Sequence, residues 1–440
     1  MVVSPVNLLD QPHKTLLATG SITTYAASLT HLDGFAFLDS RRGGRHCAYD
    51  IIAAQPRAVL RLADYDRHLT AWMAAVESRL TAGATGGHSL LAVGFLDYDS
   101  AAHGHGVTQR STPRAAVGLY EWCIVCDKAS QRLWFIGSDR VPQLPDDVAE
   151  LIASARPQQG TFALDSAFQA HISHGDYVAA VSTIRSYIAA GDCYQVNFAQ
   201  RFSAGFSGDS FSAYLRLRDV APGDFSAFLR LSSDHAILSL SPERFLSTRD
   251  GQVTTQPIKG TRPRHSDPIV DRRIAEELQQ SAKDRAENIM ITDLLRNDLG
   301  RLCLPGSVKT PDICVLHSYA NVHHLVSRIE GVLRDDVTPG ELLIGCSPGG
   351  SITGAPKHRA MQIIAELENE PRGIYCGSVF ALDGRGWMES SIAIRTMEIT
   401  ANVITCWGGG GIVYDSEADA EYQETLDKVG AFMRALEPSD

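Results

Sequence analysis

The stretch FLSTRDGQVTTQPIKGTRPR, residues 245–264, contains a predicted β-hairpin and an unusually placed lysine. Asp250-Gly251 separates two runs of strand-forming residues, and this dipeptide is typical of a two-residue hairpin. Lys259 stands between Ile258 and Gly260, just after a proline. A turn with a lysine at its tip is the simpler interpretation, because Pro and Gly mark turns more often than active sites. The alternative is a functional lysine beside a glycine that lets a ligand approach closely.

Strands and helices are mixed irregularly on both sides of this hairpin. Residues 1–160 are expected to be mostly β, with one helix at about 64–82. Further helices are expected at 175–191, 269–298, 338–344, 356–368 and 417–436, and strands at 194–201, 225–231, 235–240, 374–382, 389–398 and 402–407. The pattern predicts an α+β fold. We expect an N-terminal β-rich subdomain, residues 1–160, followed by a second region, residues 161–440.

Composition and charge narrow the range of partners. The 440 residues are 44% hydrophobic and 21% charged, which is ordinary for a globular protein with a large core. The formal net charge is -11, and no run rich in lysine and arginine occurs. A nucleic-acid or membrane partner is therefore not expected, since either requires a basic surface. The N-terminus lacks the pattern of a signal peptide, so we expect a cytoplasmic protein.

Neither the cysteines nor two neighbouring histidines indicate a metal centre. The nine cysteines are widely scattered, which favours reduced thiols over a disulfide framework. Cys123 and Cys126 form the one CxxC, but in the expected strand they point to opposite faces. His103 and His105 lie in the stretch 101–116, which we interpret as a solvated loop because no acidic or thiol partner is near in sequence.

Two expected helices carry acids with the same spacing. Glu287 falls on the apolar face of its helix, with Asp284 one turn before it, and either a salt bridge to an arginine or a cation would compensate its charge. Glu421 and Glu424 repeat the spacing on the last helix, where periodicity favours a solvated acidic face. Acid pairs on two helices are also what a Mg²⁺ site between helices requires.

Two glycine-rich stretches and one arginine are further candidates. SPGGSITGAPK, residues 347–357, resembles a phosphate-binding loop but has Ala355 after Gly354 where Lys should stand, so we reject a nucleotide site. The run Gly408–Gly411 follows an expected strand and is either a flexible turn or a place where a ligand lies against backbone. Arg395, alone in an apolar strand, fits an ion pair or a fork for a carboxylate equally well.

Taken together, a series of motifs resembles the chorismate-binding enzymes, which include anthranilate, isochorismate, salicylate and aminodeoxychorismate synthases. In chain order they are GDCYQVNFAQRF, SPERF, PIKGTRPR, AENIMITDLLRNDLGR, HLVS, SPGGSITGAPKHRAM, IYCGSVF, SIAIRT and GGGGIVYDSEADAEYQET. The resemblance is dense over about residues 175–438. It implies two facing antiparallel sheets with surrounding helices, an anthranilate synthase component I-like fold, and a site in the cleft between the sheets.

Two positions indicate the branch of the family. Members that use water carry a lysine where this chain has Gln195, so the resemblance implies ammonia as the nucleophile. Anthranilate synthases carry alanine in place of Lys259, and this lysine marks the branch that makes aminodeoxychorismate for para-aminobenzoate and folate. In that branch it is a covalent nucleophile. Anthranilate synthesis, or chorismate binding without catalysis, are the alternatives.

The resemblance also assigns roles to residues. Mg²⁺ is expected between Glu287 and Glu424, with Asp284 and Glu421 around them, holding the ring carboxylate of chorismate with Gly260 and Thr261. The enolpyruvyl carboxylate is assigned to Arg395, Tyr375, Gly409 and Gly410, while Ser351 and His324 line the pocket. Glu243 is the expected acid for the C4 hydroxyl. We therefore expect a lowered pKa for Lys259 and a raised pKa for Glu243.

Two departures from relatives bear on regulation and partners. Feedback-regulated anthranilate synthases carry Leu-Leu-Glu-Ser near the N-terminus, where this chain has FAFLDS, residues 35–40, which argues against tryptophan regulation. No Gly-x-Cys-x-Gly elbow of a glutamine-hydrolysing triad occurs. The ammonia is therefore expected from a separate glutamine amidotransferase subunit.

Overall fold

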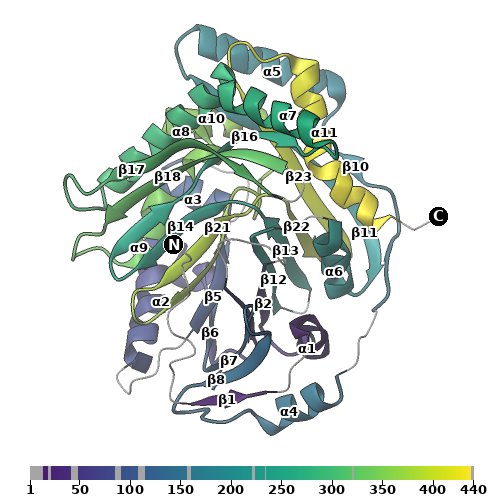
Figure 1. Ribbon diagram of the computed structural model, residues 1–440, viewed down its shortest axis with the longest axis vertical. Helices are drawn as coiled ribbons and strands as arrows, with labels where there is room; N and C mark the ends of the chain where they lie inside the picture. Colours follow the sequence, from purple (N-terminus) through teal and green to yellow (C-terminus); the bar gives the residue numbers. More distant parts are fainter. Residues whose placement is uncertain are drawn as a thin grey trace.

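Two large antiparallel sheets form the centre of the molecule, and helices cover them (Figure 1). The computed structural model describes residues 13–17, 21–40, 48–84, 91–107, 114–155, 160–220, 223–232, 234–319 and 322–437. In each sheet, strands that precede residue 140 form one end, and strands from later in the chain form the other. The α+β class with two antiparallel sheets is confirmed.

The first sheet joins N-terminal strands to the strands of the glycine-rich stretch. Its described strands, in spatial order, are β1 (Lys14–Leu16), β8 (Arg132–Gly137), β7 (Trp122–Asp127), β3 (Tyr49–Ala53), β2 (Phe35–Asp39), β12 (Phe225–Ser232), β13 (His235–Ser241), β22 (Thr396–Thr400), β23 (Val403–Ile412), β11 (Gln195–Gly208) and β10 (Gln169–Ala170), with β9 (Phe162–Leu164) and β19 (Gly354–Ala355) beside β11.

The second sheet contains the hairpin predicted at Asp250-Gly251. Its strands are β16 (Ile258–Pro263), β18 (Val322–Val332), β15 (Gln252–Thr255), β14 (Arg244–Arg249), β21 (Met388–Ile392), β20 (Ser378–Asp383), β5 (Leu91–Leu96), β6 (Ala115–Tyr120) and β4 (Ala58–Arg61), with β17 (Lys309–Ser318) beside β18. Asp250 and Gly251 both have positive φ, as a tight hairpin turn requires.

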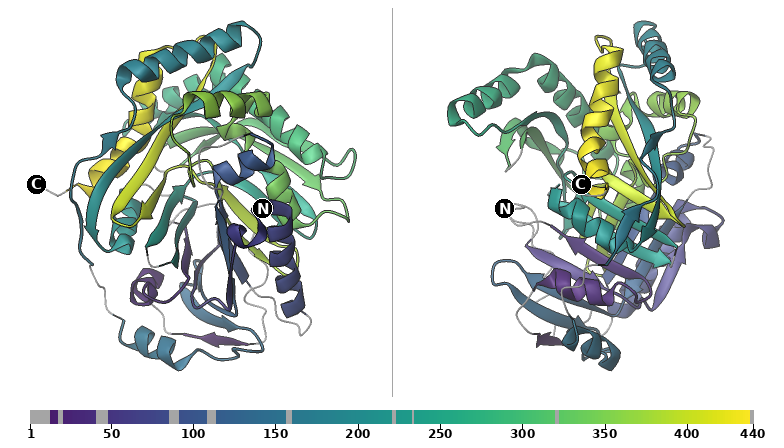
Figure 2. Two further views of the ribbon diagram at one scale, coloured as in Figure 1. Left: turned by 180° about the vertical axis from the view of Figure 1, so that it is seen from behind. Right: turned by 90° about the vertical axis from the view of Figure 1, so that its right-hand side faces the viewer.

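The helices surround the sheets, and Figure 2 shows them from two further sides. They are α1 (Ile22–Leu29), α2 (Leu69–Ala84), α3 (Tyr98–Gly104), α4 (Asp146–Ala153), α5 (His174–Ala189), α6 (Ser210–Val220), α7 (Pro268–Gln280), α8 (Ala282–Gly300), α9 (Pro339–Cys346), α10 (Lys357–Leu367) and α11 (Ala418–Leu436), with short 3₁₀ turns at Leu62–Tyr65 and Gly350–Ile352. No helix in the described ranges is long and apolar enough to cross a membrane.

Alternation along the strands creates three apolar layers. In β2, Ala36 packs between the two sheets, whereas Phe37 packs on the outer face under helices. Cys123 and Cys126 of β7 divide between the same two layers, as the sequence predicted. The third layer lies on the outer side of the second sheet and extends to β11.

Two local predictions were wrong. The helix expected at 269–298 is two helices, because Ser281 ends α7 and its hydroxyl caps α8 by accepting from the Asp284 N–H at 3.3 Å. The loop expected at 101–116 begins as part of α3, and His105 Nε2 lies 2.8 Å from the Ser347 carbonyl oxygen. Asp97 caps α3 through the Ser100 N–H, a signal present in the sequence.

The boundary predicted at residue 160 stays a prediction. Strands from before it pair directly with strands from after it: β2 pairs with β12, and β5 pairs with β20. The two regions therefore share both sheets.

Candidate active site

Lys259 lies on a bulged strand. β16 pairs with β18, and the register shifts between Ile258 and Thr261, so Lys259 and Gly260 occupy the irregularity. Gly260 has φ +86°, and a Cβ there would lie 3.0 Å from the Asp284 Cβ, so this position requires glycine. A bulge redirects a side chain that a regular ladder would place differently. The simple turn was the wrong interpretation.

The Lys259 amine lies among charges from three other elements. Burial lowers the pKa of Lys259, and Glu287, Glu243 and Glu424 oppose that shift, while Lys428 adds to it. Among the residues that the structure describes, none forms an ion pair with this lysine. Its lowered pKa agrees with the sequence-based expectation, and it increases the fraction of neutral, nucleophilic amine.

Glu243 is a buried carboxyl directly before β14. It is 5% exposed, and Ser351 Oγ donates a hydrogen bond of 2.8 Å to its Oε1. Burial raises the pKa of Glu243 to about 7, although Ser351, Lys259 and the Ile258 N–H all favour its charged form. The expected direction is again found. A carboxyl with this pKa holds its proton for part of the time near neutral pH, as a general acid must.

Acids of the two helices lie within electrostatic reach of each other through Glu287 and Glu424, although each pair has a different environment. Asp284 Oδ2 accepts from Arg262 at 2.8 Å, so the salt bridge considered from the sequence exists, but on Asp284. Burial raises the pKa of Glu287, which lies within electrostatic reach of Asp284 and Glu424. Within the described residues, no group of three or more His, Cys, Asp or Glu side chains is arranged as metal ligands. Protein atoms alone therefore do not complete a cation site.

The prediction of a solvated acidic face on α11 is correct for only one of its two acids. Glu424 is half exposed and pairs with Lys428 at 2.6 Å. Glu421 is 6% exposed and accepts from Ser416 Oγ at 2.7 Å. The buried side of this helix runs through Glu421, Thr425, Val429, Phe432 and Leu436, rotated from the stripe that hydrophobicity predicts. The rotation arises because α11 packs against β23 as well as α5 and α6.

The glycine run forms part of β23 and does not follow it as a turn. Gly409 pairs with Ala199 of β11. A Cβ on Gly409 would lie 2.7 Å from the Tyr375 hydroxyl, and one on Gly410 would lie 3.0 Å from Glu421 Oε2. Tyr375 is buried and stacks on Trp407, with ring centroids 5.7 Å apart. The missing side chains therefore let a tyrosine and an acid approach the strand from its two faces.

Arg395 and His324 border the same region. Arg395 follows β21 with φ +50°, and burial lowers its pKa, with Glu243 as the opposing charge. No ion pair of Arg395 is found in the described ranges, which favours a carboxylate fork over the ion pair. His324 pairs with Thr261 across β18 and β16, and its Nδ1 lies 2.8 Å from the Thr261 hydroxyl. Burial lowers the pKa of His324 to about 4, so its ring is neutral near pH 7.

Sequence reasoning missed Lys428. Its Nζ donates to the Gly409 carbonyl oxygen at 2.7 Å and pairs with Glu424 one helical turn away. It thus ties α11 to the glycine strand beside Lys259. The i, i+4 spacing from Glu424 was the available signal.

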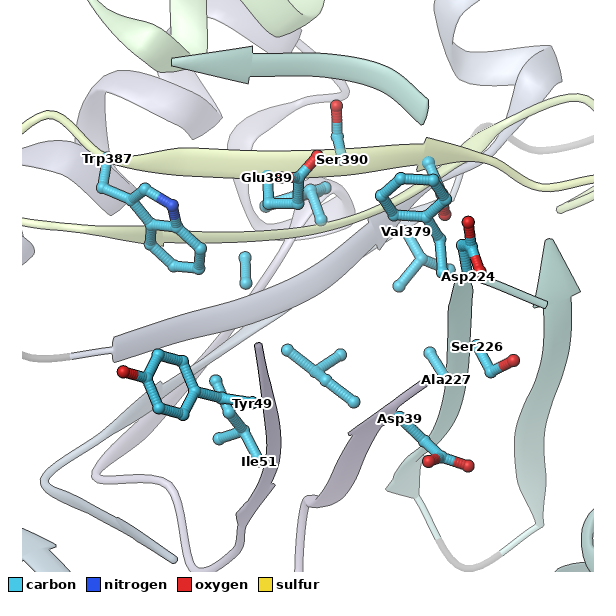
Figure 3. A pocket seen from close by; sticks show the side chains of 15 residues that line it. Asp39, Tyr49, Ile51, Asp224, Ser226, Ala227, Val379, Trp387, Glu389 and Ser390 are labelled. Carbon is cyan, nitrogen blue, oxygen red and sulfur yellow. The ribbon is translucent and has the colours of Figure 1, made fainter. Parts of the chain in front are cut away.

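A cavity lies between the sheets, and its lining does not include these residues (Figure 3). It measures about 640 Å³, part of it open to solvent, and its walls include Tyr49, Phe225, Trp387 and the acids Asp39, Asp224 and Glu389. Leu38 and Asp39 come from the stretch 35–40. The expectation about tryptophan regulation stays untested.

Comparison with known proteins identifies the family. The family model described as chorismate binding enzyme matches residues 33–434, nearly the whole chain. This chain belongs to the chorismate-binding enzymes. The resemblance inferred from the motifs is confirmed.

Two relatives and one solved structure illustrate the similarity of this chain to other members of the family. The chain is 47% identical to "Aminodeoxychorismate synthase component 1" of Salmonella typhimurium over 326 residues, covering 74% of this chain and 71% of the relative. It is 41% identical to the protein of the same name from Klebsiella aerogenes, over 89% of this chain and 91% of the relative. Anthranilate synthase component I from Streptococcus pneumoniae has the same fold, with a TM-score of 0.76 and 29% identity over 90% of this chain and 94% of that one. The expected anthranilate synthase component I-like fold is therefore confirmed.

Proposed function

We propose that this chorismate-binding enzyme converts chorismate and ammonia into 4-amino-4-deoxychorismate through a covalent bond to Lys259. One observation carries the proposal: an amine of lowered pKa without an ion-pair partner lies near a buried carboxyl of raised pKa. Both shifts favour the forms that the reaction needs, a neutral amine on Lys259 and a protonated carboxyl on Glu243. The names of the relatives support the same activity.

In the first displacement, neutral Lys259 attacks C2 of chorismate. The new N–C2 bond forms, the ring double bond shifts, and the C4–O bond breaks. Glu243 gives its proton to the departing hydroxyl, which leaves as water. Ser351 positions the Glu243 carboxyl through the 2.8 Å hydrogen bond, and this fixed geometry replaces a random encounter.

In the second displacement, ammonia attacks C4. The double bond shifts back, the N–C2 bond breaks, and Lys259 leaves as the neutral amine. The Glu243 carboxylate takes one proton from the new ammonium group and is ready for another cycle. Two displacements with opposite allylic shifts exchange hydroxyl for amine at one carbon, and the balance is chorismate plus ammonia to product plus water.

Mg²⁺ fits the acids on α8 and α11. Its ligands would be Glu287 and Glu424, with Asp284 and Glu421 close to them, because Mg²⁺ prefers a few carboxylates completed by substrate oxygens. Burial raises the pKa of Glu287, and the acids Asp284 and Glu424 add to that shift, so a cation here would favour its charged form. When bound, the ion supplies positive charge against the ring carboxylate, which Gly260 and Thr261 also contact.

The remaining residues bind and orient the substrate. Arg395 and Tyr375 hold the enolpyruvyl carboxylate with the backbone of Gly409 and Gly410, and neutral His324 lines the pocket beside Thr261. Lys428 fixes the Gly409 carbonyl and adds positive charge. A glutamine amidotransferase is the proposed source of ammonia, in agreement with the designation component 1 of the relatives.

The decisive experiment incubates the chain with chorismate, ammonium and Mg²⁺ and identifies products by mass. We expect aminodeoxychorismate, with no aromatic amine until a lyase is added. Direct appearance of fluorescent anthranilate would assign the alternative synthase. Isochorismate as the main product would refute the role given to Gln195, and no turnover under any of these conditions would favour a chorismate-binding protein without catalysis.

A further inference from the structure

A buried ion pair between Arg372 and Glu368 lies directly after α10. Arg372 is 2% exposed and Glu368 is 6% exposed. The guanidinium donates to the Glu368 carboxylate from both Nε and Nη2, each at 2.7 Å. The ring centroids of Tyr98 and Tyr375 lie 4.6 and 5.7 Å from the central carbon of the guanidinium. Two charge-assisted hydrogen bonds and two aromatic rings therefore hold Arg372 in one orientation.

The same ion pair binds backbone groups of β11 where its pairing with β19 ends. That pairing covers residues 195–196. The Asn197 carbonyl oxygen then accepts from Arg372 Nη2 at 2.6 Å. The Ala199 N–H donates to Glu368 Oε1 at 2.9 Å. The two side chains thus take the place of a neighbouring strand, because they satisfy backbone groups that would otherwise be buried without partners.

Arg372 also holds the 3₁₀ turn that carries Ser351. Its Nη1 donates to the Ile352 carbonyl oxygen at 3.0 Å, and Ile352 is the last residue of this turn. Ser351, one residue before, is 5% exposed and donates to Glu243 Oε1 at 2.8 Å. Two hydrogen bonds and one peptide bond therefore connect the guanidinium to the Glu243 carboxyl.

We propose that Arg372 is a positioning residue that holds the Ser351 hydroxyl on Glu243 by fixing the 3₁₀ turn. This inference rests on the proposed function, in which Glu243 is the acid. A buried ion pair adds little net stability, because the lost hydration of both charges offsets their attraction. Its effect on geometry is larger, since a displacement of about 1 Å in a reacting group can lower a rate about 10²-fold.

The first test measures adduct formation on Lys259 with chorismate and Mg²⁺, with ammonia withheld. Arg372→Lys keeps a positive charge beside Glu368, but an ammonium group lacks the planar fork and cannot reach the same acceptors together. We expect the rate at saturating chorismate to fall about 10–100-fold. Ser351→Ala should slow the reaction to a similar extent. A wild-type rate in Arg372→Lys would overturn the proposal.

The double variant that combines Arg372→Lys with Ser351→Ala separates positioning from a general effect on the fold. If the arginine acts through the serine, the double variant should be no more than about twofold slower than Ser351→Ala alone. Losses that multiply would overturn the proposal, because the arginine would then act by another route.

The titration of Glu243 in the substrate-free protein gives a readout that does not depend on activity. Burial raises the pKa of Glu243 to about 7, and the hydrogen bond from Ser351 opposes that shift. The other charges that face this carboxyl, Lys259 and Arg395, are the same in every variant. The infrared band of the protonated carboxyl, identified by its absence in Glu243→Gln, should therefore persist to higher pH in both Ser351→Ala and Arg372→Lys. An unmoved titration in Arg372→Lys would contradict the proposal.

Arg218→Lys is the matched control, because Arg218 likewise donates two hydrogen bonds to a buried carboxylate, that of Asp39, outside the proposed site. It should leave adduct formation within about twofold of the wild-type rate, and a loss equal to that of Arg372→Lys would overturn the proposal. A wild-type chain that forms no adduct would instead refute the proposed function, while the titration of Glu243 would still report whether Arg372 acts on it.

Glu368→Gln repeats the test if the arginine variant does not fold. It removes the charge that orients the guanidinium and leaves the hydrogen bond to the Ile352 carbonyl available. We expect adduct formation to slow about tenfold, which corresponds to one weakened charge-assisted hydrogen bond, and not to slow further when Ser351→Ala is added. A wild-type rate in Glu368→Gln would overturn the proposal.

Discussion

The acids that line the cavity between the sheets and the amine of Lys259 differ in whether they are paired. In the cavity between the sheets, Asp39 is bound by Arg218 and Tyr214, and Glu389 receives two hydrogen bonds from Arg244. Around Lys259, the amine has no ion pair in the described chain and its pKa is shifted. Paired charges are stable and unreactive, whereas unpaired buried charges are poised for chemistry. The contrast distinguishes the acids of the cavity between the sheets from the proposed nucleophile, Lys259.

The largest loss of turnover is expected when the Lys259 amine is removed. With ammonia withheld, wild-type protein with chorismate and Mg²⁺ should gain the mass of chorismate minus water, and peptide mapping should find it on Lys259. Lys259→Ala should lose the adduct and reduce turnover by about 10³-fold or more. Lys259→Arg should behave alike, because a guanidinium stays protonated. Wild-type rates in both variants would show that Lys259 is not the nucleophile.

Glu243→Gln should lower the rate of adduct formation by about 10²–10⁴-fold, the usual contribution of a general acid. In the wild type, this rate should decline as pH rises through about 7, because Glu243 then loses its proton. The folded-state pKa is raised, so its protonated form also stabilises the fold at low pH and that contribution is lost above about 7. Thermal unfolding of Glu243→Gln should lack this loss. Adduct formation by Glu243→Gln at the wild-type rate would exclude Glu243 as the acid.

A smaller effect is expected from single changes among the helix acids. Glu287→Gln and Glu424→Gln should raise the Mg²⁺ concentration for half-maximal turnover by about 10–100-fold. A chelator should abolish wild-type turnover. Asp335→Asn, an exposed acid outside this group, is the control for loss of charge. Full activity in excess chelator would remove Mg²⁺ from the proposal.

The smallest effect on turnover should come from a change in the cavity between the sheets, where Asp39 is paired with Arg218. Asp39→Asn breaks a largely buried ion pair with Arg218 and should destabilise the fold by about 2–4 kcal/mol, measured by denaturant unfolding. Turnover of the folded fraction should change less than about twofold, because additivity holds between groups that share no partner. A large loss of turnover without loss of stability would show that this cavity is coupled to the surroundings of Lys259.

Much of the fold could be predicted from the sequence because local patterns and the tertiary environment agree. Asp250-Gly251 turns a hairpin, and the alternation of β7 divides Cys123 from Cys126. The acid pairs were found by spacing alone, although which member is buried was not. The rotated face of α11 illustrates why: a helix contacting several elements buries residues that its hydrophobic stripe does not mark.

The sequence by itself determined the family and the α+β class, and it singled out Lys259 and Glu243 as the candidate nucleophile and acid, because these depend on residue type and order. Tertiary structure decided the bulge that presents Lys259, the pairing of the glycine run within β23, and the role of Lys428. It also decided which charges are paired. The physical reason is that pKa and pairing depend on burial and on neighbours contributed by β16, α8 and α11, which are far apart in sequence and meet only in the folded chain.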